Sequence, residues 1–118
     1  MAKILVVEDA VFVRNWCSRL LREKGYDVVE ATNGDEALEI YRKEKPDGVL
    51  LDITTPATDG VVTIQKIMRL DPAARVAMVT AMGQNALVLT AIEAGARDSM
   101  MKPFDSTRVL DAVEKLVG

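Results

Sequence analysis

The chain has 118 residues, enough for one domain of ordinary size, and 49% of them are hydrophobic. Its net charge of −3 excludes the basic stripe that nucleic-acid binding needs, and the absence of histidine excludes histidine-based catalysis and most zinc sites. No apolar run approaches the ~20 residues of a membrane span. The first strand begins without a signal peptide, and the lone Cys17 cannot form an internal disulfide. We therefore expect a cytoplasmic protein without membrane insertion.

Short apolar runs alternate with segments of helical period along the whole chain. The runs that predict strands are 4–7, 27–31, 49–51, 76–79 and 100–101. Helices are expected over residues 10–24, 34–45, 60–70 and 84–94, and from about Ser106 onward. This alternation is typical of βαβ units and predicts one α/β domain over residues 1–118. We expect the flavodoxin-like doubly wound (βα)5 fold, with a five-stranded parallel sheet in the order 2-1-3-4-5.

Local signals mark the ends of two helices. Asn33 and Glu36 have the spacing of a capping box, in which each side chain bonds to the backbone of the other residue. Pro46 ends the helix that follows this box. The pair Asp105-Ser106 predicts the cap and first turn of the last helix.

The fourth predicted helix contains very little charge. At helical spacing Leu89 and Ile92 can face the sheet together, which leaves Leu87 or Val88 near solvent. With Met101 on the next strand, this orientation indicates an apolar surface for a partner protein. A short helix that is simply buried on most sides is the alternative interpretation.

Polar side chains stand at the ends of four of the apolar runs. Glu8-Asp9 follows the first run, Asp52 the third, Thr80 the fourth and Lys102 the fifth. The carboxyl ends of parallel strands meet at one edge of the sheet, where doubly wound folds bind their ligands. We therefore expect three carboxylates, a hydroxyl and an ammonium group to lie close together.

Such a cluster suits a divalent cation and a phosphoryl group. Three ionised carboxylates (−3) and Lys102 (+1) leave a charge of −2, which one Mg²⁺ would neutralise. Asp52 is the candidate nucleophile, because a carboxylate can accept a phosphoryl group as an acyl phosphate. Lys102 would offset charge on that group, and Thr80 could donate a hydrogen bond to it. Alternatively, Glu8 and Asp9 only cap the first helix.

Over its whole length the sequence resembles the receiver domains of bacterial two-component response regulators, particularly the chemotaxis-type (CheY-like) single-domain regulators. The segments that carry the resemblance are Glu8-Asp9, 51–60 around Asp52, 80–84 and 102–104. It implies that Asp52 accepts a phosphoryl group from a histidine kinase or phosphotransfer protein. It also implies that Mg²⁺ is the cofactor. Asp9, Asp52 and the backbone carbonyl of Thr54 would bind the ion, and Glu8 would act through a bound water.

The resemblance has further implications for the remaining positions. Thr80 and Lys102 would contact the phosphoryl group, and the Lys102–Pro103 bond would be cis. Thr54 and Met82 would tune how quickly the phosphoryl group is lost. The protein would catalyse its own phosphotransfer and dephosphorylation rather than act as a conventional enzyme. It would signal to a downstream protein target through its fourth helix, fifth strand and fifth helix.

One position departs clearly from the family pattern. Receivers usually carry an aromatic residue three positions before the lysine, and rotation of that residue reports phosphorylation. This chain has Ser99 there. A serine cannot fill or vacate a ring-sized pocket, so the usual coupling between Thr80 and an aromatic ring does not carry over.

Three other interpretations stay open. A flavodoxin-like electron carrier would share the sheet order, but the acids of the first loop would repel the FMN phosphate. An aspartyl-nucleophile phosphatase would carry a second acid where this chain has Thr54. The third alternative is a receiver module of a larger regulator or hybrid kinase. Because the chain ends at Gly118 without a linker, we expect a self-standing protein.

Overall fold

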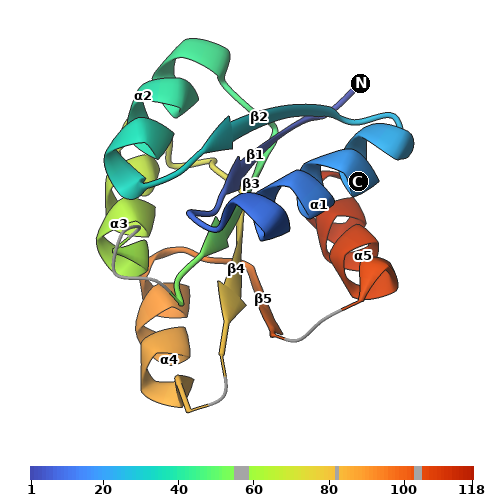
Figure 1. Cartoon of the computed structure of the whole chain (residues 1–118). Coiled ribbons are helices and arrows are strands. Elements are labelled where there is room, and N and C mark those ends of the chain that lie inside the picture. The colour runs from blue at the N-terminus through green and yellow to red at the C-terminus, as the bar shows by residue number, and fades with distance from the viewer. Residues whose placement is uncertain (55–58, 82, 103–104) are drawn as a thin grey trace.

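The computed structural model describes residues 1–54, 59–81, 83–102 and 105–118, and its strands and helices alternate as predicted (Figure 1). The strands are β1 (Lys3–Val7), β2 (Asp27–Ala31), β3 (Gly48–Asp52), β4 (Val76–Thr80) and β5 (Asp98–Met101). The helices are α1 (Val11–Glu23), α2 (Gly34–Glu44), α3 (Gly60–Leu70), α4 (Asn85–Ala94) and α5 (Ser106–Val117). Each predicted element is present, and its ends differ from the prediction by one or two residues at most.

All five strands are parallel and lie in the order β2-β1-β3-β4-β5, which confirms the predicted fold class. The register sets Val7 opposite Ala31 on one side and opposite Leu51 on the other. Asp52 pairs with Val79. Strands paired in this register end together, so the carboxyl ends of β1, β3 and β4 form one rim of the sheet.

Helices cover both faces of the sheet. α2, α3 and α4 pack on one face, and α1 and α5 pack on the other (Figure 1). Successive residues of a strand point to opposite faces. In β1, Leu5 and Val7 therefore belong to the first core, and Ile4 and Val6 belong to the second. Strands buried on both faces appear in a sequence as continuous apolar runs, which is the pattern that identified them.

The structure contains one of the two hydrogen bonds of the predicted capping box at the start of α2, and in the other the donor is a different residue. Asn33 accepts a hydrogen bond from the Glu36 N–H at 2.8 Å, as predicted. The Glu36 carboxylate accepts from the Thr32 N–H at 3.1 Å rather than from the N–H of Asn33. The predicted cap of α5 is also present, since Asp105 accepts from the Arg108 N–H at 3.0 Å.

The predicted orientation of α4 is wrong. Leu89 and Ile92 do not face the sheet, because they are 63% and 48% exposed. Leu87 and Val88 instead pack against the core around the fully buried Ala91. Leu87, Val88 and Leu89 are consecutive apolar residues, and such a run fits more than one rotation of the helix about its axis. The spacing alone therefore does not determine which of them face the sheet. The small Ala91 side chain lets the helix lie close to the sheet, and this favours the observed orientation.

Gly60, the first residue of α3, lies against Ile53. A Cβ atom at Gly60 would come 2.1 Å from Ile53 Cγ2 and 2.5 Å from Ile53 Cβ. Gly60→Ala should therefore lower the free energy of unfolding by about 1–3 kcal/mol. Without this contact alanine would favour the helix by about 1 kcal/mol, so the sign of the change is informative. Urea denaturation measures it.

The background variant Ile53→Gly supplies the control. It removes both the Cγ2 and the Cβ atom that block the new Cβ, so the cost of Gly60→Ala should shrink there. An equal cost in both backgrounds would contradict the proposed steric cause.

Candidate functional site

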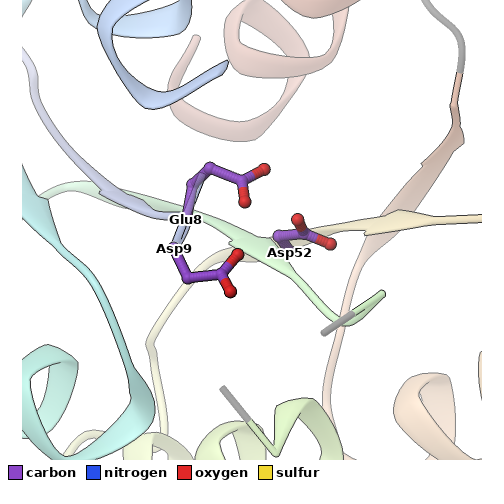
Figure 2. Close-up of side chains that lie close together, drawn as sticks. All are labelled: Glu8, Asp9 and Asp52. Atoms are coloured by element: carbon purple, nitrogen blue, oxygen red, sulfur yellow. The ribbon is translucent and has the colours of Figure 1, made fainter. Parts of the chain in front are cut away.

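The groups predicted at the strand ends gather at the rim of the sheet. Glu8 and Asp9 follow β1, Asp52 ends β3, Thr80 ends β4, and Lys102 follows β5. One carboxylate oxygen from each of Glu8, Asp9 and Asp52 lies within 4.8 Å of the other two (Figure 2). Lys102 Nζ lies 2.9 Å from Asp52 Oδ2 and 3.4 Å from Glu8 Oε1. The predicted cluster of three carboxylates and one ammonium group is therefore present.

Asp52 is buried, and both of its carboxylate oxygens accept hydrogen bonds. Oδ1 accepts from the Thr54 N–H at 2.7 Å and from the Thr54 hydroxyl at 2.6 Å, and Oδ2 accepts from Lys102 at 2.9 Å. Burial acts to raise the pKa of Asp52. Hydrogen bonds from Glu8, Thr54 and Lys102 outweigh burial and hold this pKa below its usual value. Asp52 is therefore a buried carboxylate that stays ionised, as a nucleophile must.

Glu8 is buried as well, but its carboxyl group behaves in the opposite way. Burial and a hydrogen bond to Asp52 raise the pKa of Glu8 to about 7, and the Ala10 N–H and Lys102 only partly oppose this. Below that pH, Glu8 carries a proton and donates a hydrogen bond to Asp52. The two neighbouring carboxyl groups thus share one proton, and Asp52 keeps the negative charge.

Asp9 is exposed where Glu8 and Asp52 are buried, so the cluster opens to solvent at Asp9. In Figure 2 the Glu8 and Asp9 side chains extend to opposite sides of the chain, and both carboxyl groups lie on the side of the chain where Asp52 is drawn. The Glu8 oxygens are engaged by the Ala10 N–H at 3.1 Å and by Lys102. Mg²⁺ prefers a few carboxylate oxygens and retains several waters. An exposed Asp9 beside an ionised Asp52, with Glu8 set further back, fits this preference.

The loop between β4 and α4 leaves the same rim. Thr80 is buried, and its hydroxyl donates to the Met100 carbonyl at 3.4 Å, a long hydrogen bond. Two hydrogen bonds connect Ala81 and Gln84. The Ala81 N–H donates to Gln84 Oε1 at 2.7 Å, and the Gln84 N–H donates to the Ala81 carbonyl at 3.2 Å. The loop is therefore closed by Gln84, while the Thr80 hydroxyl is held only weakly.

Ser99 lies on β5, an edge strand of the sheet. Its N–H donates to Asp98 Oδ1 at 2.8 Å, and its carbonyl accepts from Arg108 Nη2 at 2.6 Å. Arg108 also lies 3.6 Å from Asp98 Oδ1. Side chains thus satisfy backbone groups that an edge strand would otherwise offer to another chain.

Residues 4–114 match the family model of the response regulator receiver domain. The chain belongs to this family. The chemotaxis protein CheY of Thermotoga maritima is 45% identical over 115 residues, which cover 97% of this chain and 96% of that protein. The chemotaxis protein CheY of Bacillus subtilis is 45% identical over 117 residues, which cover 98% of each protein.

Solved structures agree with this assignment. The CheX–CheY–BeF3–Mg²⁺ complex of Borrelia burgdorferi is similar with a TM-score of 0.89 and 33% identity, covering 97% of this chain and 87% of that chain. The receiver interpretation is therefore confirmed over the electron carrier and the phosphatase. No helix in the described ranges of this receiver is long and apolar enough to cross a membrane.

Three contacts in the receiver site were not predicted from the sequence. The Thr54 hydroxyl donates to the Asp52 carboxylate, Arg14 Nη1 donates to the Glu8 carbonyl at 2.8 Å, and Gln84 closes the loop after β4. Polar residues within a few positions of a functional acid are the only signal for such contacts, and that signal is weak. Some predictions concern residues outside the described ranges, namely the cis bond to Pro103, the tuning role of Met82, and the family matches at 55–58 and Phe104.

The pKa of Glu8 predicts how the receiver responds to pH without a metal. This pKa rises from 4.5 to about 7 on folding, so the folded state binds the proton more tightly than the unfolded chain does. The contribution of Glu8 to stability should be complete below pH 4.5 and should be lost as the pH rises to about 7. The lowered pKa of Asp52 acts only below its usual value of 3.8, outside this window.

Glu8→Gln should flatten this pH dependence, because the amide donates to Asp52 at every pH. Urea denaturation in the presence of a chelator, at several pH values across the window, measures the effect. Glu39→Gln changes an exposed glutamate of α2 and serves as the matched control. A pH dependence that survives in Glu8→Gln would rule out Glu8 as its source.

Proposed function

We propose that this receiver accepts one phosphoryl group on Asp52 and that the acyl phosphate is its signalling state. The observation that carries the proposal is the buried Asp52 carboxylate at the end of β3, 2.9 Å from Lys102 Nζ. Glu8 and Asp9 beside it complete an oxygen-rich site for a cation. Membership of the receiver family supports the same role.

The proposed reaction is a direct phosphoryl transfer. A carboxylate oxygen of Asp52 attacks phosphorus, an O–P bond forms, and the P–N bond to a donor histidine breaks. This chain contains no histidine, so that histidine belongs to a kinase or phosphotransfer protein. Lys102 offsets charge on the phosphoryl oxygens, and the Thr80 hydroxyl donates to one of them. Attack by water on the acyl phosphate would later return free Asp52, so the protein catalyses both steps on itself.

Mg²⁺ is the proposed cofactor. Asp9 and Asp52 would hold it with the backbone carbonyl of Thr54, and Glu8 would act through a bound water. When bound, the ion neutralises carboxylate charge that would repel an incoming phosphoryl donor. The CheY of Borrelia burgdorferi was solved with BeF3 and Mg²⁺, which supports this assignment.

We further propose that α4, β5 and α5 form the surface for a downstream protein. Leu89, Ile92 and Met101 on α4 and β5 are 63%, 48% and 53% exposed. Large apolar side chains exposed on neighbouring elements favour binding to another protein. The complex of the Borrelia burgdorferi CheY with CheX supports a protein partner. The proposal includes a cytoplasmic location, in line with the lone, buried Cys17.

Asp52→Asn should abolish phosphorylation, because an amide cannot form the acyl phosphate. Intact-protein mass spectrometry after treatment with acetyl phosphate and Mg²⁺ should show one added phosphoryl group on the wild type. Asp35→Asn changes an exposed aspartate of α2 and should leave labelling unchanged. Undiminished labelling of Asp52→Asn would refute the proposed acceptor, and undiminished labelling in excess chelator would refute the metal requirement.

Phosphorylation should rearrange the segment 80–92 and leave Ser99 nearly unchanged. The Thr80 hydroxyl would exchange its 3.4 Å bond to Met100 for a charge-assisted bond, which is worth about 1.5–3 kcal/mol. Ser99 offers no ring that could rotate, and Asp98 and Arg108 hold its backbone. Amide chemical shifts with and without beryllofluoride, a phosphoryl mimic, measure the response. Large shifts confined to α2 and α3, with α4 unmoved, would contradict this route.

A further inference from the structure

The turn between β1 and α1 lacks the usual helix cap. Its N-cap residue is Ala10, which offers no capping side chain, and the first turn of α1 contains no acidic residue. Two contacts to Glu8 hold the turn instead. The Ala10 N–H donates to Glu8 Oε2 at 3.1 Å, and Arg14 Nη1 donates to the Glu8 carbonyl at 2.8 Å. Arg14 is itself anchored in α1, since its N–H donates to the Ala10 carbonyl at 2.9 Å.

The carbonyl that Arg14 holds belongs to the peptide bond between Glu8 and Asp9. A peptide group is planar, so fixing its oxygen fixes the plane from which the Asp9 side chain begins. The Glu8 N–H is fixed on the other side, by a 3.0 Å bond to the Ala31 carbonyl at the end of β2. Asp9 is the exposed member of the carboxylate cluster, so burial does little to set its direction.

We propose that Arg14 is a positioning residue for the cation site, acting through the Glu8 carbonyl to direct the Asp9 carboxylate toward Asp52. This inference rests on the proposed Mg²⁺ site. Arginine suits the task because its planar fork gives a directed donor and because it keeps its charge at all relevant pH values. Residues that orient metal ligands typically change metal affinity by about 10-fold to 100-fold when they are replaced.

A charge effect of Arg14 would have the opposite sign from a positioning effect. A nearby guanidinium repels a cation, so its removal would strengthen Mg²⁺ binding if charge were its main contribution. Loss of the bond to the Glu8 carbonyl frees the turn and weakens Mg²⁺ binding. The direction of the change in affinity therefore distinguishes the two roles.

The test measures Mg²⁺ affinity by titration calorimetry on the full chain. Arg14→Met removes charge and donor, and we expect binding about 10-fold weaker or more. Arg14→Lys keeps the charge and a point donor without the fork, and should lie between Arg14→Met and the wild type. Arg19→Met is the matched control. It removes one arginine from the exposed face of the same helix, beside Asn15 and Arg22, and should leave the affinity within about 2-fold.

A second readout separates positioning from general loss of structure. In metal-free Arg14→Met, amide shifts should change mainly at residues 8–11, and the urea midpoint should fall by little. If Arg14→Met does not fold, Arg14→Lys carries the test through the same calorimetry. Unchanged or tighter Mg²⁺ binding in a folded Arg14 variant would overturn the inference alone. No Mg²⁺ binding by the wild type would contradict the proposed cation site itself and the inference with it.

Discussion

Electrostatic repulsion among Glu8, Asp9 and Asp52 is the constraint on which the site depends. Their oxygens lie within 4.8 Å of one another, and such carboxylates do not all stay ionised without compensation. The protein meets the constraint in three ways. Lys102 pairs with Asp52, Glu8 keeps a proton up to a pH of about 7, and Asp9 remains in contact with solvent. The negative charge is thereby held on the buried Asp52 carboxylate, beside the exposed Asp9.

The sheet creates this repulsion, because the parallel register ends β1 and β3 at the same level. The same topology supplies the compensation. Lys102 follows β5, which is two strands away from β3, and its long side chain spans that distance to reach Asp52. A hydroxyl at the end of β4, between them, is then well placed to detect a change of charge at Asp52. The order of the strands, more than any single helix, determines which functional groups meet.

Much of this could be predicted from the sequence, because buried parallel strands appear as apolar runs and their ends carry the functional groups. Asp52, Thr80 and Lys102 were identifiable in this way. The orientation of α4 about its axis could not be identified from the sequence, because consecutive apolar residues fit several orientations. Only packing against the sheet selects the orientation in which Ala91 is buried. Contacts such as that of Arg14 with the Glu8 carbonyl depend on the path of a turn, which residue spacing does not specify.

The substitution of serine for an aromatic residue at Ser99 has a consequence for how a signal leaves the site. The resemblance to other receivers implies that the rotation of an aromatic ring at this position reports phosphorylation. Here the Ser99 N–H is bonded to Asp98, and the Ser99 carbonyl is bonded to Arg108, which links β5 to α5. On the other side of Thr80, a loop closed by Gln84 leads into α4. We expect a shift of Thr80 to pass through this loop to α4, where the exposed Leu89 and Ile92 would carry the change to a partner.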